Sequence, residues 1–585
     1  MATAGGGQHW RIDTSGPIAD AEELRALLGR AELVPGAADD RAAGTLRDAV
    51  RGVARQLDDY VIPRLRDLDA PALVVVGGST GSGKSTIVNS LVGAEVTRPG
   101  VLRPTTRAPV LVHHPDAARW FTDDRVLGSF ARVQGGDASG PQQLRLVASD
   151  AVGEALALLD APDIDSVEEL NRAAAGHLLD AADLWVFVTT AARYADAVPW
   201  DVLATARARG VGVALVLNRV PPGAGGQVAA HLREMLTAAG LGEAPLLVLD
   251  EQPLVQGRLP AAQVAPLRDW LAGIAADHDV RAELVRQGLR GTLADVADRT
   301  DAVVEALERR ADAADRLRDQ AASTFARTRA QLARDVRDGT VMRGEVLARW
   351  QDLVGTGELL RQLQSRIGRW RDRVVSAVTG RTPAVEGFQG AVESGVELLV
   401  RERVAAAVDE VGALWRTTPD GEAVLAGGLA EDGLPPADDL SRPSVDLPAR
   451  TERLVRDWQA ALLDLLRAEG SGRRMTAKVL SYGVNGVALV LMVGVFAQTG
   501  GLTGGEVAIA GGSTAVGSTL LEALLGDQAV RRLTERARAD LDARLAALLN
   551  AEAARFTRAV DARAPDPTLA VSLRDAARAL RRGLS

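Results

Sequence analysis

The chain has 585 residues, a formal net charge of −9 and a pI of about 5.5, a balance that argues against a general nucleic-acid binder. Cysteine is absent, which excludes a disulfide framework and a thiolate metal site. The length exceeds what one hydrophobic core supports, so we expect two or more domains.

Residues 1–69 are predicted to form an N-terminal tail followed by helices. The opening stretch MATAGGGQHW contains no apolar run and is not expected to be a signal peptide. Apolar residues between 18 and 68 recur at helical spacing, for example Leu24, Leu27 and Leu28. Two interpretations stay open: the helices form a packing layer on the next domain, or they join helices from the far C-terminus.

The stretch from Leu73 to Gly93 predicts a buried strand, a glycine-rich turn and a helix that begins at Lys84. Its turn matches the phosphate-binding loop G-x-x-x-x-G-K-[ST] without a mismatch. Lys84, one of only two lysines in the chain, is expected to bridge the β- and γ-phosphates, and the Ser85 hydroxyl to bind Mg²⁺. The predicted nucleotide-binding residues of this loop are Gly78, Ser79, Thr80, Gly81, Ser82, Gly83, Lys84, Ser85 and Thr86.

Residues 70–276 alternate between apolar runs and helical patterns, which predicts an α/β domain with a mostly parallel sheet and helices on both faces. Ligands of such a sheet bind at the carboxyl ends of its strands. The predicted strands are Leu73–Val76, Val110–Val112, Leu156–Leu159, Leu184–Val188, Val213–Leu217 and Leu246–Leu249.

Three further stretches place polar residues near strand ends. Thr105 and Thr106 precede the second predicted strand, where a threonine can bind Mg²⁺ and report the γ-phosphate. Asp160 ends the third strand, where a carboxylate can hold Mg²⁺ through water, and Asn218 ends the fifth, where a base-contacting amide is expected. Taken together at the ends of successive strands, the set indicates a nucleotide hydrolase.

The rest of the chain is predicted to be a helical stalk over 277–470, an apolar membrane hairpin over 471–530 and C-terminal helices over 531–585. The segment Val479–Gly505 contains no charged residue and is long enough to cross a bilayer. A second, weaker apolar stretch runs from Val507 to Leu525. Lys and Arg flank both ends of the hairpin but not its tip, which favours attachment to the cytoplasmic face of the membrane through 479–525. The alternative is a hairpin buried in the helical bundle.

The sequence resembles the translation-factor-related class of GTPases and, within it, the bacterial dynamin-like proteins. The resemblance is carried by GSTGSGKST, RPTTRAP, DAPD and LNR, all between residues 78 and 219. It implies a large GTPase that binds GTP and Mg²⁺ and has a helical stalk with a membrane-binding tip. By this resemblance Thr106 matches the switch threonine, with Thr105 as the fallback, and Asp160 matches the first residue of D-x-x-G.

The sequence departs from the family pattern at four positions, namely Asp163, Ile164, Arg219 and Pro221. Asp163 stands where D-x-x-G has glycine, and Ile164 follows where Ras-like enzymes carry a water-orienting glutamine. The base motif N-K-x-D reads Asn218-Arg219-Val220-Pro221, so the carboxylate that reads guanine is missing. Catalytic roles are therefore assigned to Lys84 and Thr106, with help from Thr80 or Ser82 or from a dimer partner.

The sequence thus predicts a membrane-associated, dynamin-like GTPase that couples nucleotide state to membrane binding or remodelling. Expected partners are membrane lipid, with anionic lipid as one option, and a second copy of the nucleotide domain in a homodimer or higher oligomer. Nucleic acid is not an expected partner. The alternatives are a membrane-anchored regulatory GTPase without remodelling activity, an ATPase, and a nucleotide-binding scaffold with little turnover.

Overall fold

The computed structural model describes residues 14–32, 41–97, 108–123, 125–135, 140, 142–165, 169–338, 348, 383–426, 439–469, 491–492, 495 and 527–583. The chain divides into two compact units. The first comprises Met1–Val34, Arg41–Arg309 and Pro565–Ser585, and the second Pro35–Asp40 and Arg310–Ala564. The first unit contains the sheet and the predicted nucleotide site.

Eight strands of the first unit form one sheet in the order β3-β4-β2-β5-β1-β6-β7-β8. Neighbouring strands are parallel except for the antiparallel pair β2 and β5. The six predicted strands are all present, and β3 and β4 are additional. The strands are β1 (Ala72–Gly78), β2 (Val110–His113), β3 (Ala131–Gln134), β4 (Gln143–Ala148), β5 (Leu156–Asp160), β6 (Leu184–Thr190), β7 (Gly212–Val220) and β8 (Leu246–Asp250).

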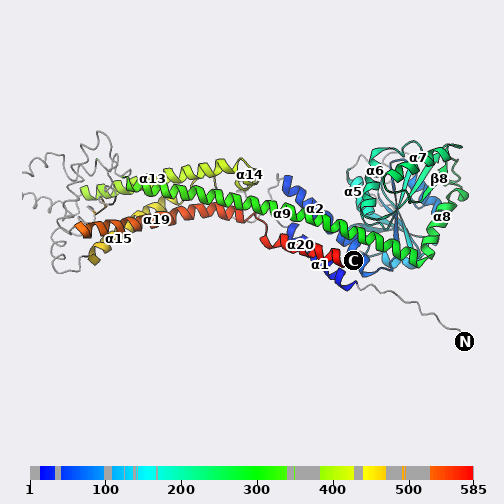
Figure 1. The fold of residues 1–585 in the computed structure, drawn as a ribbon, viewed down its shortest axis with the longest axis horizontal. Coiled ribbons are helices and arrows are strands. Elements are labelled where there is room, and N and C mark those ends of the chain that lie inside the picture. The colour runs from blue at the N-terminus through cyan, green and yellow to red at the C-terminus, as the bar shows by residue number, and fades with distance from the viewer. Residues whose placement is uncertain are drawn as a thin grey trace, which may run out of the picture. The chain divides into compact units, whose positions relative to one another are not determined.

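Helices cover both faces of this sheet (Figure 1). Successive residues of a strand point to opposite faces, and β1 shows this directly: Leu73 and Val75 belong to one core cluster, Val74 and Val76 to another. The helices after β1 are α4 (Lys84–Val92), η2 (Pro115–Trp120), α5 (Glu169–Asp180), α6 (Ala197–Ala208), α7 (Gly225–Ala238) and α8 (Ala261–Ala276). The prediction of an α/β domain with a mostly parallel sheet is confirmed.

The N-terminal helices pack against both the sheet and the C-terminal helix. Leu24 and Leu28 of the first helix share a core cluster with Leu573 near the C-terminus and with sheet residues such as Trp185. Figure 1 shows the first and last helices side by side, and contacts between them are extensive. Both interpretations of these helices therefore hold at once. The elements are α1 (Ser15–Glu32), α2 (Arg41–Gln56), the π-helical turn η1 (Leu57–Val61), α3 (Ile62–Arg66) and α20 (Pro567–Arg582).

A fully buried carboxylate, Asp183, ties these helices to the sheet. It accepts hydrogen bonds from the backbone N–H of Leu73 at 2.7 Å and the hydroxyl of Tyr60 at 2.9 Å, and it pairs with the buried guanidinium of Arg64 at 2.5 Å. Burial first, and the Asp183 charge second, raise the pKa of Tyr60 well above its usual value, so Tyr60 stays a hydrogen-bond donor. Asp183 therefore fixes the first residues of β1 and β6 relative to α3.

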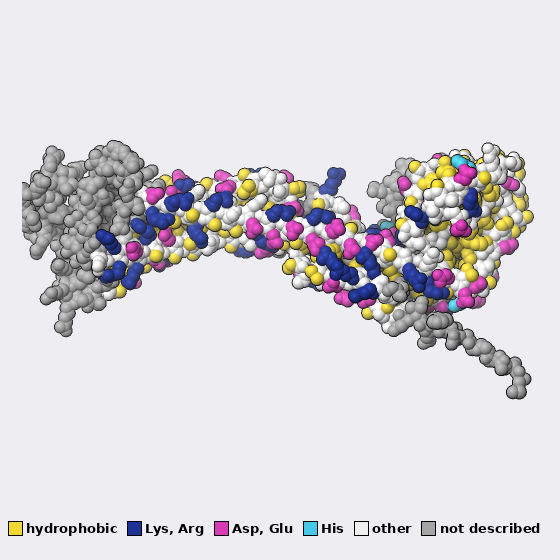
Figure 2. Space-filling view, viewed as in Figure 1, with side chains coloured by type: hydrophobic (Ala, Val, Ile, Leu, Met, Phe, Trp, Pro, Cys, Tyr) yellow, Lys and Arg dark blue, Asp and Glu magenta, His cyan; other side chains and the backbone are white. Residues whose placement is uncertain are grey.

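The second unit is a helical bundle with its own apolar core. Trp415, Trp458 and Phe556 are fully buried in it, and the Trp458 indole N–H donates to the carbonyl of Ala537 at 2.9 Å. On the face shown in Figure 2, positive and negative side chains are interspersed over its helices, as on a solvated surface. The helices are the later part of α9 (His278–Arg337), α13 (Pro383–Trp415), α14 (Pro419–Ala426), α15 (Leu447–Glu469) and α19 (Asp527–Asp561).

α14 lies at the start of the stretch Pro419–Leu447, whose Gly, Pro and Asp content predicts a loop. α14 begins at Pro419, where a missing N–H costs nothing because the first helical N–H groups are unpaired anyway. The negative charges of Asp420 and Glu422, in its first turn, interact favourably with the positive end of the helix dipole. The same residue types that suggest a loop thus begin a short helix.

The predicted membrane hairpin, 479–525, lies outside the described residues except for Leu491, Met492 and Val495. These three side chains are buried in the core of the second unit. Among the helices that the structure describes, none combines the length and the apolar character that crossing a bilayer requires.

Candidate nucleotide-binding site

The predicted phosphate loop connects the end of β1 to the start of α4. Gly78, Gly81 and Gly83 have φ angles of +146°, +76° and +95°, which side chains other than glycine rarely adopt. A Cβ at Gly78 would lie 2.1 Å from the carbonyl oxygen of Val188. All three glycines are therefore required by backbone conformation, and Gly78 also by close packing against β6.

Lys84 begins α4 and is nearly fully buried within this loop. Its ammonium group donates to the carbonyls of Gly78 at 3.0 Å and Ser79 at 3.1 Å, and it forms an ion pair with the buried carboxylate of Asp163. The loop thus holds its cation in place with two backbone carbonyls. The third partner, Asp163, is the residue that stands at the glycine position of D-x-x-G.

Asp160 ends β5 and is fully buried beside Ser85. One carboxylate oxygen accepts from the hydroxyls of Ser85 and Thr97, each at 2.7 Å. The other oxygen has no hydrogen-bond partner within the described part of the chain. Burial raises the pKa of Asp160, although both hydroxyls oppose the shift. An unpartnered buried oxygen next to a serine hydroxyl fits the hard oxygen ligands and bound water that Mg²⁺ prefers.

Two residues that sequence reasoning missed hold Thr80 of the loop. Asp165 accepts from the Thr80 N–H at 2.6 Å and from its hydroxyl at 2.8 Å, and Arg193 donates to the Thr80 carbonyl at 3.1 Å. Arg193 also pairs with Asp165 at 2.9 Å. Burial alone would raise the pKa of Asp165, but the bonds from Thr80 and Arg193 outweigh it and the pKa is lowered. The only sequence signal was that both residues follow strands.

Asn218, at the carboxyl end of β7, is brought against the loop. Its amide donates to the carbonyl of Ser82 at 2.8 Å, and a Cβ on Gly83 would lie 2.5 Å from the same nitrogen. Arg219 follows, exposed and with a φ of +55°. Asn218 therefore supports the loop, while base contacts by Asn218 and Arg219 stay predictions.

The hydroxyls of Ser79 and Ser82 are buried and have no partner among the described residues. Ile164 is also buried, and its side chain has no polar atom that could orient a water molecule. The predicted switch residues Thr105 and Thr106 lie outside the described residues. The structure thus gathers the loop, Asp160 and Asn218 at one edge of the sheet, and the roles of Thr106, Thr80 and Ser82 stay predictions.

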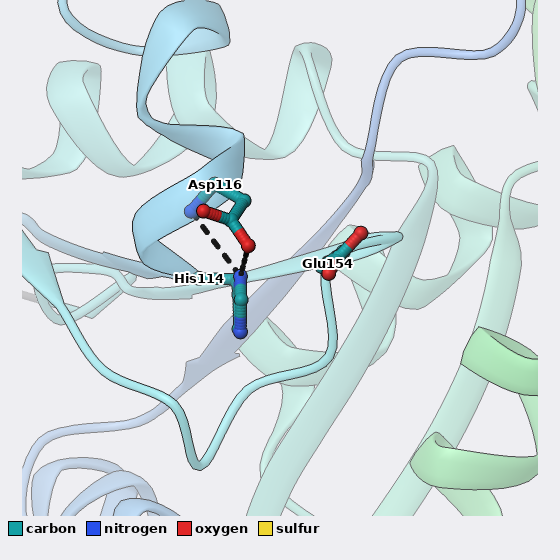
Figure 3. Close-up of side chains that lie close together, drawn as sticks. All are labelled: His114, Asp116 and Glu154. Carbon is teal, nitrogen blue, oxygen red and sulfur yellow. Dashed lines mark hydrogen bonds and ion pairs between the residues drawn. The ribbon is translucent and has the colours of Figure 1, made fainter.

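His114, Asp116 and Glu154 form a separate group, in which one ligand atom from each lies within 4.8 Å of the others (Figure 3). The His114 ring accepts from the backbone N–H of Asp116 at 3.2 Å and caps η2. The carboxylate of Asp116 is largely exposed. Helix capping accounts for the position of the histidine, and we assign no metal to this group.

The Mg²⁺ requirement is expected to depend on Ser85 and Asp160. Ser85→Ala and Asp160→Asn each remove an oxygen suited to bind Mg²⁺ or its bound water. The Mg²⁺ concentration for half-maximal activity should therefore rise at least roughly tenfold, as is typical when groups around a metal site are mutated. The measurement is a titration of nucleotide turnover against Mg²⁺. Ser90→Ala is the matched control, because it makes the same substitution further along α4, where the hydroxyl donates to the carbonyl of Thr86 and to no predicted Mg²⁺ ligand. An equal shift in all three variants would contradict the ligand assignment.

No protein-family model matches the sequence, and no curated protein sequence matches it. Among solved structures, a member of an oligomerised bacterial dynamin pair described in the long-range sensing and tethering of membranes is 10% identical. The match covers 99% of this chain and 96% of that one, with a TM-score of 0.40. Bacterial dynamins are structural neighbours of this chain.

Two further structures extend this comparison. The bacterial dynamin GTPase LeoA from ETEC is 13% identical, with a TM-score of 0.23 and coverage of 94% of this chain and 98% of that one. Toc33 from Arabidopsis thaliana, solved with Mg²⁺ and GMPPNP, is 15% identical, with a TM-score of 0.24 and coverage of 40% and 93%. We infer function from the residues of the site alone.

Proposed function

We propose that the protein is a Mg²⁺-dependent nucleoside triphosphatase that uses GTP and couples its nucleotide state to membrane binding or remodelling, as a dynamin-like protein does. The observation that carries the enzymatic part is the convergence of three groups at the carboxyl edge of the sheet. Lys84 lies inside a glycine loop of the required conformation, and the Ser85 hydroxyl lies 2.7 Å from the Asp160 carboxylate. The groups that would bind the phosphates, neutralise their charge and hold Mg²⁺ therefore lie at one place.

In this proposal, the chain's own residues bind and orient the nucleotide. Backbone N–H groups of the loop and the start of α4 face the phosphates, and Lys84 neutralises charge on the terminal phosphates. Bound Mg²⁺ would supply further charge neutralisation between the phosphates, held by Ser85, Asp160 and Thr106. Ile164 cannot orient the attacking water, so this task falls to Thr80, to Ser82 or to a partner nucleotide domain.

The test is turnover by the purified full-length protein with GTP or ATP, with and without Mg²⁺ and anionic liposomes. We expect Mg²⁺-dependent release of phosphate from GTP, increased by liposomes. Competition by ATP measures base preference, which rests on the family resemblance and Asn218 because Pro221 replaces the base-reading carboxylate. Preference for ATP would favour the ATPase alternative.

A second candidate is a nucleotide-binding membrane scaffold with little turnover. It is favoured by the buried apolar side chain of Ile164 at the position after D-x-x-G. The same assay separates the candidates, because a scaffold would bind GTP tightly while releasing no phosphate, with or without liposomes. A membrane-anchored regulatory GTPase would turn over GTP without changing liposome shape, which electron microscopy of the liposomes would show.

The membrane part of the proposal is supported by the uncharged segment Val479–Gly505 and the basic residues that flank it. Val490→Arg places a charge in this segment at a cost of roughly 2.5–3.5 kcal/mol in a bilayer centre. We expect the variant to lose co-flotation with liposomes while it still binds nucleotide. The matched control is Val445→Arg, the same substitution at a largely exposed position of the second unit.

Flotation that is unchanged in Val490→Arg would contradict insertion of this segment. A lowered melting temperature of Val490→Arg, together with a wild type that fails to float, would instead favour the hairpin buried in the helical bundle. If the segment inserts as proposed, the protein is attached at the cytoplasmic face of the membrane. Separately from membrane attachment, we propose that the protein forms a homodimer or higher oligomer through its nucleotide domain.

A further inference from the structure

Asp163 differs from the glycine of D-x-x-G, and the structure shows what the extra carboxylate contacts. The side chains of Asp163 and Lys84 are 8% and 4% exposed and form an ion pair. An ammonium group has three N–H donors, and for Lys84 the carbonyls of Gly78 and Ser79 and the Asp163 carboxylate supply three acceptors. A phosphate oxygen that approaches Lys84 therefore finds its donors already engaged.

We propose that Asp163 is an internal competitor for the phosphate-binding cation, so that nucleotide binds only by displacing its carboxylate from Lys84. The inference rests on the proposed nucleotide site and adds a residue that sets its affinity. Asp163 is the partner that carries negative charge, so it competes with phosphate for the same cation more directly than the two carbonyls do. Because the pair is buried, the charges act on one another through a medium that screens them less than water does.

The charge balance around the site supports this role. Asp160 and Asp163 are both buried carboxylates near the single ammonium of Lys84. A phosphate chain that entered before Mg²⁺, with Asp163 still in place, would meet the carboxylates of Asp160 and Asp163 beside the ammonium of Lys84. Glycine at the same position would remove one of these negative charges and leave Lys84 available. The chain should therefore bind nucleotide more weakly than a variant with a neutral residue at 163.

The backbone around Asp163 indicates how the carboxylate withdraws. Ala161 N–H donates to the Val76 carbonyl at 3.2 Å, and Thr80 bonds the Asp165 carboxylate through its N–H and hydroxyl. The segment is thus attached to β1 and to the loop on both sides of Asp163. Displacement then requires rotation of one side chain, and the rest of the loop keeps its conformation.

The test is the equilibrium affinity of wild type, Asp163→Asn and Asp163→Gly for GTP and, as a probe without a base, for inorganic tripolyphosphate, each with Mg²⁺. Both variants should bind both ligands about tenfold more tightly or better, because a like charge beside the phosphates has been removed. Asp150→Asn is the matched control, since it removes a carboxylate that is 89% exposed, and its affinities should stay at the wild-type value. Lys84→Ala serves as the reference for loss of the site.

A second measurement keeps the inference testable if the variants are unstable. Asp163→Asn removes the negative charge that compensates the ammonium of Lys84. Without ligand, the melting temperature of this variant should therefore be lower than that of the wild type. Tripolyphosphate should raise the melting temperature of the variant by more than it raises that of the wild type. The proposed role of Asp163 would be wrong if both Asp163 variants bound with unchanged or weaker affinity while Lys84→Ala still lost binding. That result would leave the nucleotide site itself in place. Absence of GTP and tripolyphosphate binding in the wild type and in both folded Asp163 variants would instead overturn the proposed function itself.

Discussion

Lys84→Ala is expected to lower the affinity for GTP by about two orders of magnitude, because hydrogen bonds to charged groups contribute about 1.5–3 kcal/mol each. Lys84 is the cation that the loop holds in place through the carbonyls of Gly78 and Ser79. The fold is expected to persist, since the loop conformation depends on its glycines and on Asn218, but at reduced stability because the buried Asp163 carboxylate loses its ammonium partner. The measurement is equilibrium binding of a fluorescent GTP analogue, with melting curves to verify folding.

Lys478→Ala is the matched control for this prediction, since it changes the only other lysine of the chain. Its affinity for GTP should equal that of the wild type. The variant Lys84→Ala also leaves the buried carboxylate of Asp163 without its ammonium partner. The double variant Lys84→Ala/Asp163→Asn should therefore regain stability without regaining binding. Wild-type affinity in Lys84→Ala would contradict the assignment of the loop.

Asp183→Asn is expected to lower the free energy of unfolding of the first unit by about 3–5 kcal/mol, the usual cost of removing one partner from a buried ion pair. The substitution leaves the buried guanidinium of Arg64 without its negative partner. It also weakens the acceptor for the Leu73 N–H and the Tyr60 hydroxyl. Urea unfolding followed by circular dichroism measures the change.

The control for Asp183 is Asp58→Asn, which breaks an ion pair with Arg25 on the surface of the same N-terminal helices. Both of its side chains are more than a third exposed, so the loss should be within about 1 kcal/mol. A small loss for Asp183→Asn, equal to that of the control, would show that the buried pair contributes nothing to the attachment of α3. Nucleotide binding by Asp183→Asn at low temperature should persist, because Asp183 does not contact the loop.

The sequence predicts strands well where they are buried on both faces. β1, β5, β6 and β7 each contain a continuous run of buried apolar residues, since a parallel strand covered by helices on both sides has no polar face there. β3, an edge strand, and its neighbour β4 escape prediction because they keep polar, partly exposed residues that interrupt any apolar run. β8, at the opposite edge, is also partly exposed, but it keeps the apolar run Leu246–Leu249 and is predicted. Prediction therefore fails where polar residues interrupt the apolar run.

The conformation of the predicted phosphate loop follows from the sequence alone, because its glycines, Lys84 and Ser85 are neighbours along the chain and their spacing fixes their geometry. Asp160 and Asn218 lie at or near the carboxyl ends of parallel strands, so the sequence also places them at the same end of the sheet. Only the tertiary structure decided which charged and polar groups meet: Lys84 with Asp163, Thr80 with Asp165 and Arg193, and Arg64 with Asp183. These partners come from separate segments, and a buried charge takes the partner that folding brings within reach, which local spacing does not encode.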